Sequence, residues 1–240
     1  FLQRAYDQIV HDVCLQNLPV CILSDHVGLV GDDGKTHHGV LSVPMLMSIP
    51  NLTLLAPRDT RQIRQAVRAT LKLDGPCVVQ YPKEGIEPYA QNVTGEPFAV
   101  GKWQTLIPGG QDAVILAYGR MTQNAIQASE LLVRRGLSVG VIDCCSLKPL
   151  DMDCLRALFE RKAKIVTIEE GEMIGGFGSE IARVCVEENA DAPVQIIGLE
   201  NRFITHGSVP ELLRECGLTP EQLADRIEEI AGDKENSHVG

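Results

Sequence analysis

Hydrophobic residues in the first third of the chain fall into two kinds of run. Short continuous apolar runs are typical of buried strands, and apolar residues at helical spacing are typical of amphipathic helices. Strands are predicted over the runs 19–24, 52–57 and 76–82. Helices are predicted over the stretches 1–16, 39–50 and 59–73. The short connections between them predict a parallel sheet with helices on its faces.

Two of these elements carry more detailed expectations. The run PVCILS at 19–24 has no polar alternation before its last residue, which predicts a strand buried on both faces. Asp59 stands just before the helix at 59–73, in an N-cap position. The buried face of that helix is expected to hold four apolar residues: Ile63, Ala66, Val67 and Leu71.

A second alternation of the same kind begins after residue 110. Strands are predicted over 112–119, 138–144, 163–170 and 193–199. Helices are predicted over 122–136, 150–162 and 178–190, followed by two more within 210–232. Thr219 and Gln222 fit a capping box for the last helix, with Pro220 at its first helical position.

The segment between the two alternations, residues 83–101, is rich in Pro and Gly and has no clear period. It reads as a linker, so the sequence predicts the α/β class with two domains, each a mostly parallel sheet flanked by helices. The expected boundaries are a first domain over 1–85, a linker over 86–98, a second domain over 99–231 and a disordered tail over 232–240.

Composition narrows the class of protein. A formal net charge of −10 argues against a general nucleic-acid binder, which needs a basic face. No apolar run approaches the roughly 20 residues that span a bilayer, and no signal peptide is visible, so no membrane partner is expected. The eight cysteines form no C-x-x-C pair and lie mostly in apolar runs. Buried, reduced thiols and a cytoplasmic location are therefore expected.

Candidate chemistry is concentrated in the loop GLVGDDGKTHHG, residues 28–39, at the carboxyl end of the first predicted strand. Ligands of open α/β sheets bind at such ends, and glycines allow the backbone to approach them closely. A histidine of the pair His37 and His38 can shuttle a proton near neutral pH, and an aspartate of the loop can orient it or bond a hydroxyl. A solvated polar turn explains the same composition equally well. A metal site is disfavoured because adjacent histidines in a loop rarely point at one ion.

The chain resembles the C-terminal part of the 1-deoxy-D-xylulose-5-phosphate synthases, thiamine-diphosphate enzymes of the transketolase superfamily. The resemblance covers residues 1 to about 231 and rests on motifs that include FLQRAYDQIVHDV, GLVGDDGKTHHG, GPCVVQYPK, SLKPLD and TIEEGEMIGGFGSE. It implies a thiamine-diphosphate-binding fold, with most of a pyrimidine-binding domain over 1–85, followed by a transketolase C-terminal domain over 99–231.

The resemblance also implies roles by position. His37 and Asp33 match residues that meet the substrate near the reacting carbon, and Phe1 and Arg4 match cofactor-site residues. His26, Gln80, Lys83 and His38 fall at substrate-binding positions, with His38 an accessory. His26 and Gln80 stand where the family has arginines that grip the substrate phosphate, so phosphate binding is expected to be weaker or different.

The family's catalytic glutamate and its diphosphate-binding domain, with the metal motif, are not found in this sequence. The complete enzyme is expected to use thiamine diphosphate and Mg²⁺ with small-molecule substrates, pyruvate and glyceraldehyde 3-phosphate. This chain would bind the cofactor poorly and be inactive without that domain, supplied in cis or as a separate subunit. A homodimer is expected, because cofactor sites in the superfamily lie between subunits or domains.

Other functions stay open on the sequence alone. One is a degenerate, non-catalytic relative that keeps the scaffold for assembly or regulation. Others are a transketolase-type subunit with a different acceptor and a free-standing module that binds a small anion. A Rossmann dehydrogenase, suggested by GGFGSE at 175–180, is disfavoured because the sequence lacks G-x-G-x-x-G after a strand with an acidic residue about 20 positions on. That loop is expected to open a helix and pack at a domain interface.

Overall fold

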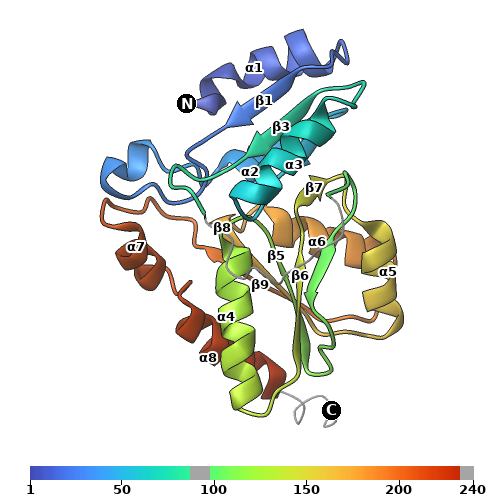
Figure 1. Ribbon diagram of the computed structural model, residues 1–240, viewed down its shortest axis with the longest axis vertical. Coiled ribbons are helices and arrows are strands. Elements are labelled where there is room, and N and C mark those ends of the chain that lie inside the picture. The colour runs from blue at the N-terminus through green and yellow to red at the C-terminus, as the bar shows by residue number, and fades with distance from the viewer. Residues whose placement is uncertain (87–97, 233–240) are drawn as a thin grey trace.

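The computed structural model describes residues 1–86 and 98–232, which form two β-sheets flanked by helices (Figure 1). The first sheet has the strand order β1 (Cys21–Ser24), β3 (Cys77–Gln80), β2 (Thr53–Leu55) and β7 (Ser146–Lys148). The second has the order β4 (Gln104–Ile107), β6 (Val139–Asp143), β5 (Ala113–Ala117), β8 (Ile165–Glu172) and β9 (Val194–Leu199). The predicted class, two mostly parallel α/β sheets, is confirmed.

The first sheet contains a strand from the second half of the chain. Strands β1, β3 and β2 are parallel, as predicted, but β7 pairs antiparallel with β2, with Leu55 opposite Ser146. No strand was predicted at β7, because three residues are too few to show a hydrophobic period. The two halves are therefore joined by a shared sheet as well as by the chain.

Strand β1 is the outer strand of this sheet, and the prediction that it is buried on both faces is wrong. Its residues alternate between exposed and half-buried, and Leu23 keeps 52% of its surface exposed. Ile22 packs against the main core, whereas Cys21 and Leu23 stay exposed. An uninterrupted apolar run shows that a strand has two apolar faces, but it does not show what covers the second one.

Helical segments surround the first sheet. They are η1 (Leu2–Ala5), α1 (Tyr6–Gln8), η2 (Ile9–Cys14), η3 (Gly31–Thr36), α2 (Ser42–Met47) and α3 (Thr60–Thr70). The first three run on from one another within the helix predicted over 1–16 (Figure 1). The expected N-cap of α3 is confirmed, since the Asp59 side chain accepts a hydrogen bond from the Gln62 amide at 2.7 Å.

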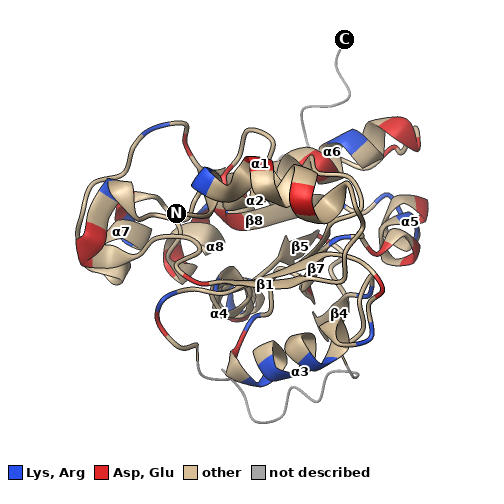
Figure 2. Cartoon of the chain, turned by 90° about the horizontal axis from the view of Figure 1, so that it is seen from above, with Lys and Arg blue, Asp and Glu red and all other residues tan. Residues whose placement is uncertain are grey.

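The buried face of α3 differs from the one expected. The helix buries Gln62, Ala66 and Thr70, while Leu71 is 81% exposed. The side-chain amide of Gln62 donates a hydrogen bond to the buried Asp143 carboxylate, so a polar residue that is hydrogen-bonded can occupy the buried face. Arginines recur along α3, where the ribbon carries the colour of basic residues (Figure 2).

The second sheet has helices on both faces. These are α4 (Met121–Arg134), α5 (Met152–Glu160), α6 (Phe177–Glu187), α7 (Val209–Glu215) and α8 (Pro220–Gly232). Alternate residues of β5 show the division, because Ile115 joins the core formed with α4 and α8 whereas Leu116 joins the core formed with α5 and α6. The capping box at Thr219 and Gln222 is confirmed by reciprocal 3.4 Å contacts. The outer strand β4, antiparallel to β6, was not predicted.

One hydrophobic core, the one that includes Leu116, extends between the two sheets. It brings Leu46 and Val78 of the first half together with Trp103 and Phe177 of the second. The expected linker (86–98) and tail (232–240) lie mostly outside the described residues, so the proposed domain boundaries stay predictions. Among the described residues, no helix is both long and apolar enough to span a membrane. All eight cysteines are free thiols, and most are buried, but Cys21 is exposed.

Candidate functional site

The loop that follows β1 folds back on itself at the carboxyl end of the strand. Its base is closed by a hydrogen bond from the Gly39 amide to the Gly28 carbonyl at 2.9 Å. Gly28, Gly31 and Gly34 have φ values of 79°, 73° and 69°, a region that side chains disfavour. The repeated glycines therefore allow the tight path of the loop, which includes η3 and carries Asp33 and His37.

A cavity of about 280 Å³ opens beside this loop. Residues that line it include Phe1, Leu23, His26, His37, Leu41 and Met45. The Phe1 ring is 72% exposed and meets the His37 ring edge to face, with centroids 5.1 Å apart. The Arg4 guanidinium lies 5.5 Å from the centroid of the same Phe1 ring. The structure thus brings three of the predicted site residues together around one aromatic ring.

Asp33 and Lys83 form an ion pair that joins the loop to the segment after β3, and neither is among the residues that line the cavity. The hydrogen bond from Lys83 lowers the pKa of the Asp33 carboxyl, and the nearby rings of His37 and His26 act in the same direction. Asp33 is consequently ionised at neutral pH and serves as a hydrogen-bond acceptor rather than as an acid.

Replacing Lys83 with methionine is expected to raise the pKa of Asp33 toward its ordinary value. Because a carboxyl whose pKa is depressed stabilises the fold above its unfolded pKa, the variant should lose little stability at acidic pH and more at neutral pH. An NMR titration of the Asp33 side chain, with Lys35→Met as the control in the same loop, measures the shift. An unchanged Asp33 pKa would show that the pair does not form in solution.

The adjacent histidines have different surroundings. His37 is exposed, and its Nδ1 lies 2.9 Å from the Thr36 hydroxyl, which leaves Nε2 for a ligand in the cavity. In His38, Nδ1 accepts a hydrogen bond from the Val30 amide at 3.1 Å, so Nε2 carries the proton donated to the Thr205 carbonyl at 3.0 Å. His38 thus fastens the loop to the second half of the chain.

Two of the predicted substrate-binding residues lie apart from each other. His26 lines the cavity, has a positive φ of 58° and sits 3.2 Å from the Asp25 carboxylate. Gln80 is buried and lines a different, smaller cavity with Arg120 and Glu170. Sequence reasoning did not single out these last two residues; the acidic pair EE at the end of a predicted strand was the available signal for Glu170.

The loop GGFGSE opens α6, as expected, and its amides are already occupied. The Glu169 carboxylate accepts hydrogen bonds from the Phe177 and Gly178 amides at 2.9 and 2.8 Å. Burial raises the pKa of Glu169 to about 7, opposed by these amides. A dinucleotide phosphate would need the same amide groups, so this arrangement opposes the dehydrogenase alternative.

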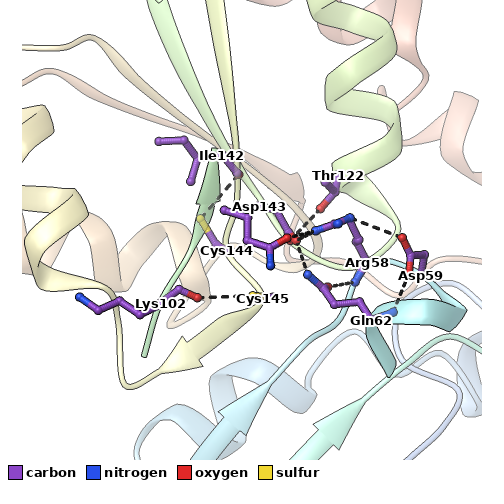
Figure 3. A network of polar contacts seen from close by, with 10 residues as sticks. Arg58, Asp59, Gln62, Lys102, Thr122, Ile142, Asp143, Cys144 and Cys145 are labelled. Atoms are coloured by element: carbon purple, nitrogen blue, oxygen red, sulfur yellow. Dashed lines mark hydrogen bonds and ion pairs between the residues drawn. The ribbon is translucent and has the colours of Figure 1, made fainter. Parts of the chain in front are cut away.

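A buried polar network joins the first half of the chain to the end of β6 in the second half (Figure 3). Asp143 at the end of β6 is fully buried and pairs with the Arg58 guanidinium. The Gln62 amide donates to the same carboxylate at 2.7 Å, and Arg58 also donates to Gln104 at 2.7 Å. Burial raises the pKa of Asp143, although Arg58 and Gln62 lower it.

Known protein families agree with this architecture. The model of the transketolase pyrimidine binding domain matches residues 1–87, and that of the transketolase C-terminal domain matches residues 101–223. The chain belongs to the transketolase family. Members of this family depend on thiamine diphosphate, and the first match contains the whole loop with Asp33 and His37.

Curated relatives of this transketolase chain are named 1-deoxy-D-xylulose-5-phosphate synthase. The protein from Rippkaea orientalis is 39% identical over 96% of this chain and 36% of its own length. The relative from Geobacillus thermodenitrificans is 42% identical over 98% of this chain and 38% of its own length. The chain thus spans little more than a third of these synthases.

Solved structures show the same fold. A split gene transketolase, described as an inactive β4 tetramer, superposes with a TM-score of 0.83 at 30% identity, over 94% of this chain and 71% of that one. Transketolase from Pichia stipitis superposes with a TM-score of 0.71 at 19% identity, over 91% of this chain and 31% of that one. The second likeness supports the transketolase fold alone.

Proposed function

We propose that this chain forms the pyrimidine-binding and C-terminal part of a 1-deoxy-D-xylulose-5-phosphate synthase. Such an enzyme joins a two-carbon unit from pyruvate to glyceraldehyde 3-phosphate. The observation that carries this proposal is the loop at 28–39, which sets His37 beside the exposed Phe1 ring at the mouth of a cavity. Identities of 39–42% with named synthases, over nearly the whole chain, favour this activity over other transketolase reactions.

The cavity beside Phe1 fits one end of thiamine diphosphate. An aminopyrimidine is a flat aromatic ring, and the exposed Phe1 side chain, with Leu23, Leu41 and Met45, offers an apolar surface for it. Arg4 would complete this side of the cofactor site. When bound, thiamine diphosphate supplies a carbon nucleophile that accepts the two-carbon unit. Mg²⁺ and the diphosphate would be held by the diphosphate-binding domain, which is not one of the two domains matched here.

His37 and Asp33 would act on the substrate. The Nε2 atom of His37 can give or take a proton at a substrate oxygen, and its neighbour Phe1 limits access of water from one side. Asp33, kept ionised by Lys83, can accept a hydrogen bond from a substrate hydroxyl. Lys83 would supply a positive charge and the His26 ring a hydrogen-bond donor for an acceptor phosphate, without the bidentate fork of an arginine.

A complete site requires a diphosphate-binding domain, in the same polypeptide or in a separate subunit. The likeness to a split gene transketolase favours a separate subunit, since the match covers 94% of this chain and 71% of that one. Exposed apolar side chains near β1 would be covered by such a domain or by a second copy in a homodimer: Leu15, Leu18, Val20 and Leu23. The free thiols suit a reducing cytoplasm.

The proposal is tested by reconstitution. This chain is mixed with the diphosphate-binding part of the Geobacillus synthase, thiamine diphosphate and Mg²⁺, and pyruvate decarboxylation is followed with and without glyceraldehyde 3-phosphate. We expect turnover only in the mixture and stimulation by the acceptor. Calorimetry should show no binding of thiamine diphosphate to this chain alone at micromolar concentrations, because its most directional contacts go to the diphosphate.

Each outcome discriminates between the candidates. Turnover with an unphosphorylated aldehyde, but not with glyceraldehyde 3-phosphate, would indicate another transketolase-type acceptor. A stable complex without turnover would favour the non-catalytic relative. Micromolar cofactor binding by the isolated chain would contradict the assignment of the diphosphate site to another domain.

A further inference from the structure

The backbone of the site loop rests on a carboxylate from the second half of the chain. The Leu29 amide donates a hydrogen bond of 2.8 Å to Oε1 of Glu170, on β8. Gly28 makes this approach possible, because a Cβ atom at that position would lie 2.6 Å from the carboxyl carbon of Glu170. The close approach of the loop backbone to Glu170, across the boundary between the halves, therefore requires glycine at position 28.

Beside this contact lies a small cavity of about 20 Å³, lined by residues that include Gln80, Arg120, Tyr118 and Glu170. Gln80 is only 1% exposed, and neither atom of its side-chain amide has a hydrogen-bond partner within the described residues. Nη2 of Arg120 is likewise buried and unpartnered there. Buried polar groups are rarely left unsatisfied, and a cavity of this size holds about one water molecule.

The charges around the cavity favour water over an anion. Nε of Arg120 lies 3.4 Å from Oε2 of Glu170, so the positive charge is already paired. Glu84 adds negative potential, since it raises the pKa of Glu170 together with burial. A water molecule can accept from Arg120 or from the Gln80 amide nitrogen and donate to the Gln80 amide oxygen, whereas an anion could only accept.

We propose that this cavity binds one water molecule between Gln80 and Arg120, and that Glu170, held by Arg120, is the positioning residue for the loop that carries Asp33 and His37. The catalytic part of this statement rests on the function proposed above. Glu170 itself does not line the cavity beside Phe1. It acts on the reaction through the backbone of the loop, four residues before Asp33.

Hydrogen–deuterium exchange on the full chain tests the positioning role without any assay of activity. Glu170→Leu removes the acceptor, and Gly28→Ala separates the loop from an intact Glu170. Both variants are expected to speed exchange of the Leu29 amide about tenfold or more. Glu172→Gln, on the same strand, and Gly85→Ala, at a glycine with open space around it, are matched controls that should exchange like the parent chain.

Two further measurements complete the test. A high-resolution crystal structure should show a water between Gln80 and Arg120, and Gln80→Leu should lose it. In the reconstituted enzyme, Gly28→Ala should lower kcat while KM for pyruvate changes little, because the loop acts on the reacting atoms. If wild-type reconstitution gives no turnover, the proposed function fails while the exchange experiment still decides the positioning role. Unchanged Leu29 exchange in both variants, or no water in the cavity, would overturn the inference.

Discussion

Replacing His37 with alanine is expected to lower kcat of the reconstituted enzyme by about 10² to 10⁴, the usual cost of losing a general acid–base group. The fold should be unaffected, because the His37 side chain is exposed and its ring contacts are to Phe1 and Thr36 at the rim of the cavity. Steady-state kinetics and a thermal unfolding curve measure the two effects separately. Asp33→Ala should lower turnover in the same direction.

His11 and His38 provide the controls for this prediction. His11 is exposed on η2, and its ring contacts Asp7, four residues earlier in the chain. His11→Ala should therefore retain the parent turnover and stability. His38→Ala should instead loosen the loop, since both ring nitrogens of His38 hold backbone groups. Near-parent turnover for His37→Ala would mean that the loop is a polar turn without a catalytic role.

Replacing Arg58 with methionine is expected to lower the free energy of unfolding by about 3–5 kcal/mol, the cost of leaving one member of a buried ion pair uncompensated. Asp143 is fully buried, and Arg58 is the cation that the structure pairs with it. Burial already raises the pKa of Asp143, and losing Arg58 raises it further. The loss should therefore be largest above this raised pKa and shrink as acid neutralises the carboxyl. Urea unfolding at two pH values measures both.

The matched control is Arg61→Met, three residues further on in the first turn of α3, where the side chain is exposed. It should change stability by about 0.5 kcal/mol or less. The double variant Arg58→Met with Asp143→Leu should recover part of the loss, because it removes the stranded charge. If Arg58→Met loses the same free energy of unfolding at all pH values, then packing of the arginine, and not its charge, stabilises the contact between the two halves.

Local patterns predicted most helices and strands, including the cap at Asp59 and the capping box at Thr219. They failed where an element depends on a distant partner. Strand β7 has three residues and exists because β2 offers an unpaired edge 90 positions away. Likewise, β1 has the uninterrupted apolar sequence of a central strand, but among the described residues it pairs with β3 alone.

In the site, too, the local features were predicted and those that depend on distant residues were not. The loop residues and their grouping with Phe1 followed from the end of a strand and from the family resemblance. The separation of Gln80 from the cavity beside Phe1 could not be foreseen, because its neighbours Arg120 and Glu170 come from strand ends 40 and 90 residues further on. The contrast between His37 and His38 also depends on Thr205, a backbone group from the far end of the chain.

Strand β7 bears on how such a gene could be divided during evolution. A break within the segment that joins the two sheets would strip β2 of its neighbour and expose the Leu54–Leu55 edge to pairing with foreign strands. Two separately synthesised fragments would then have to associate before the exposed edge of β2 paired with another chain. The pairing of β2 with β7 thus opposes a division of the gene between the two halves that the structure describes.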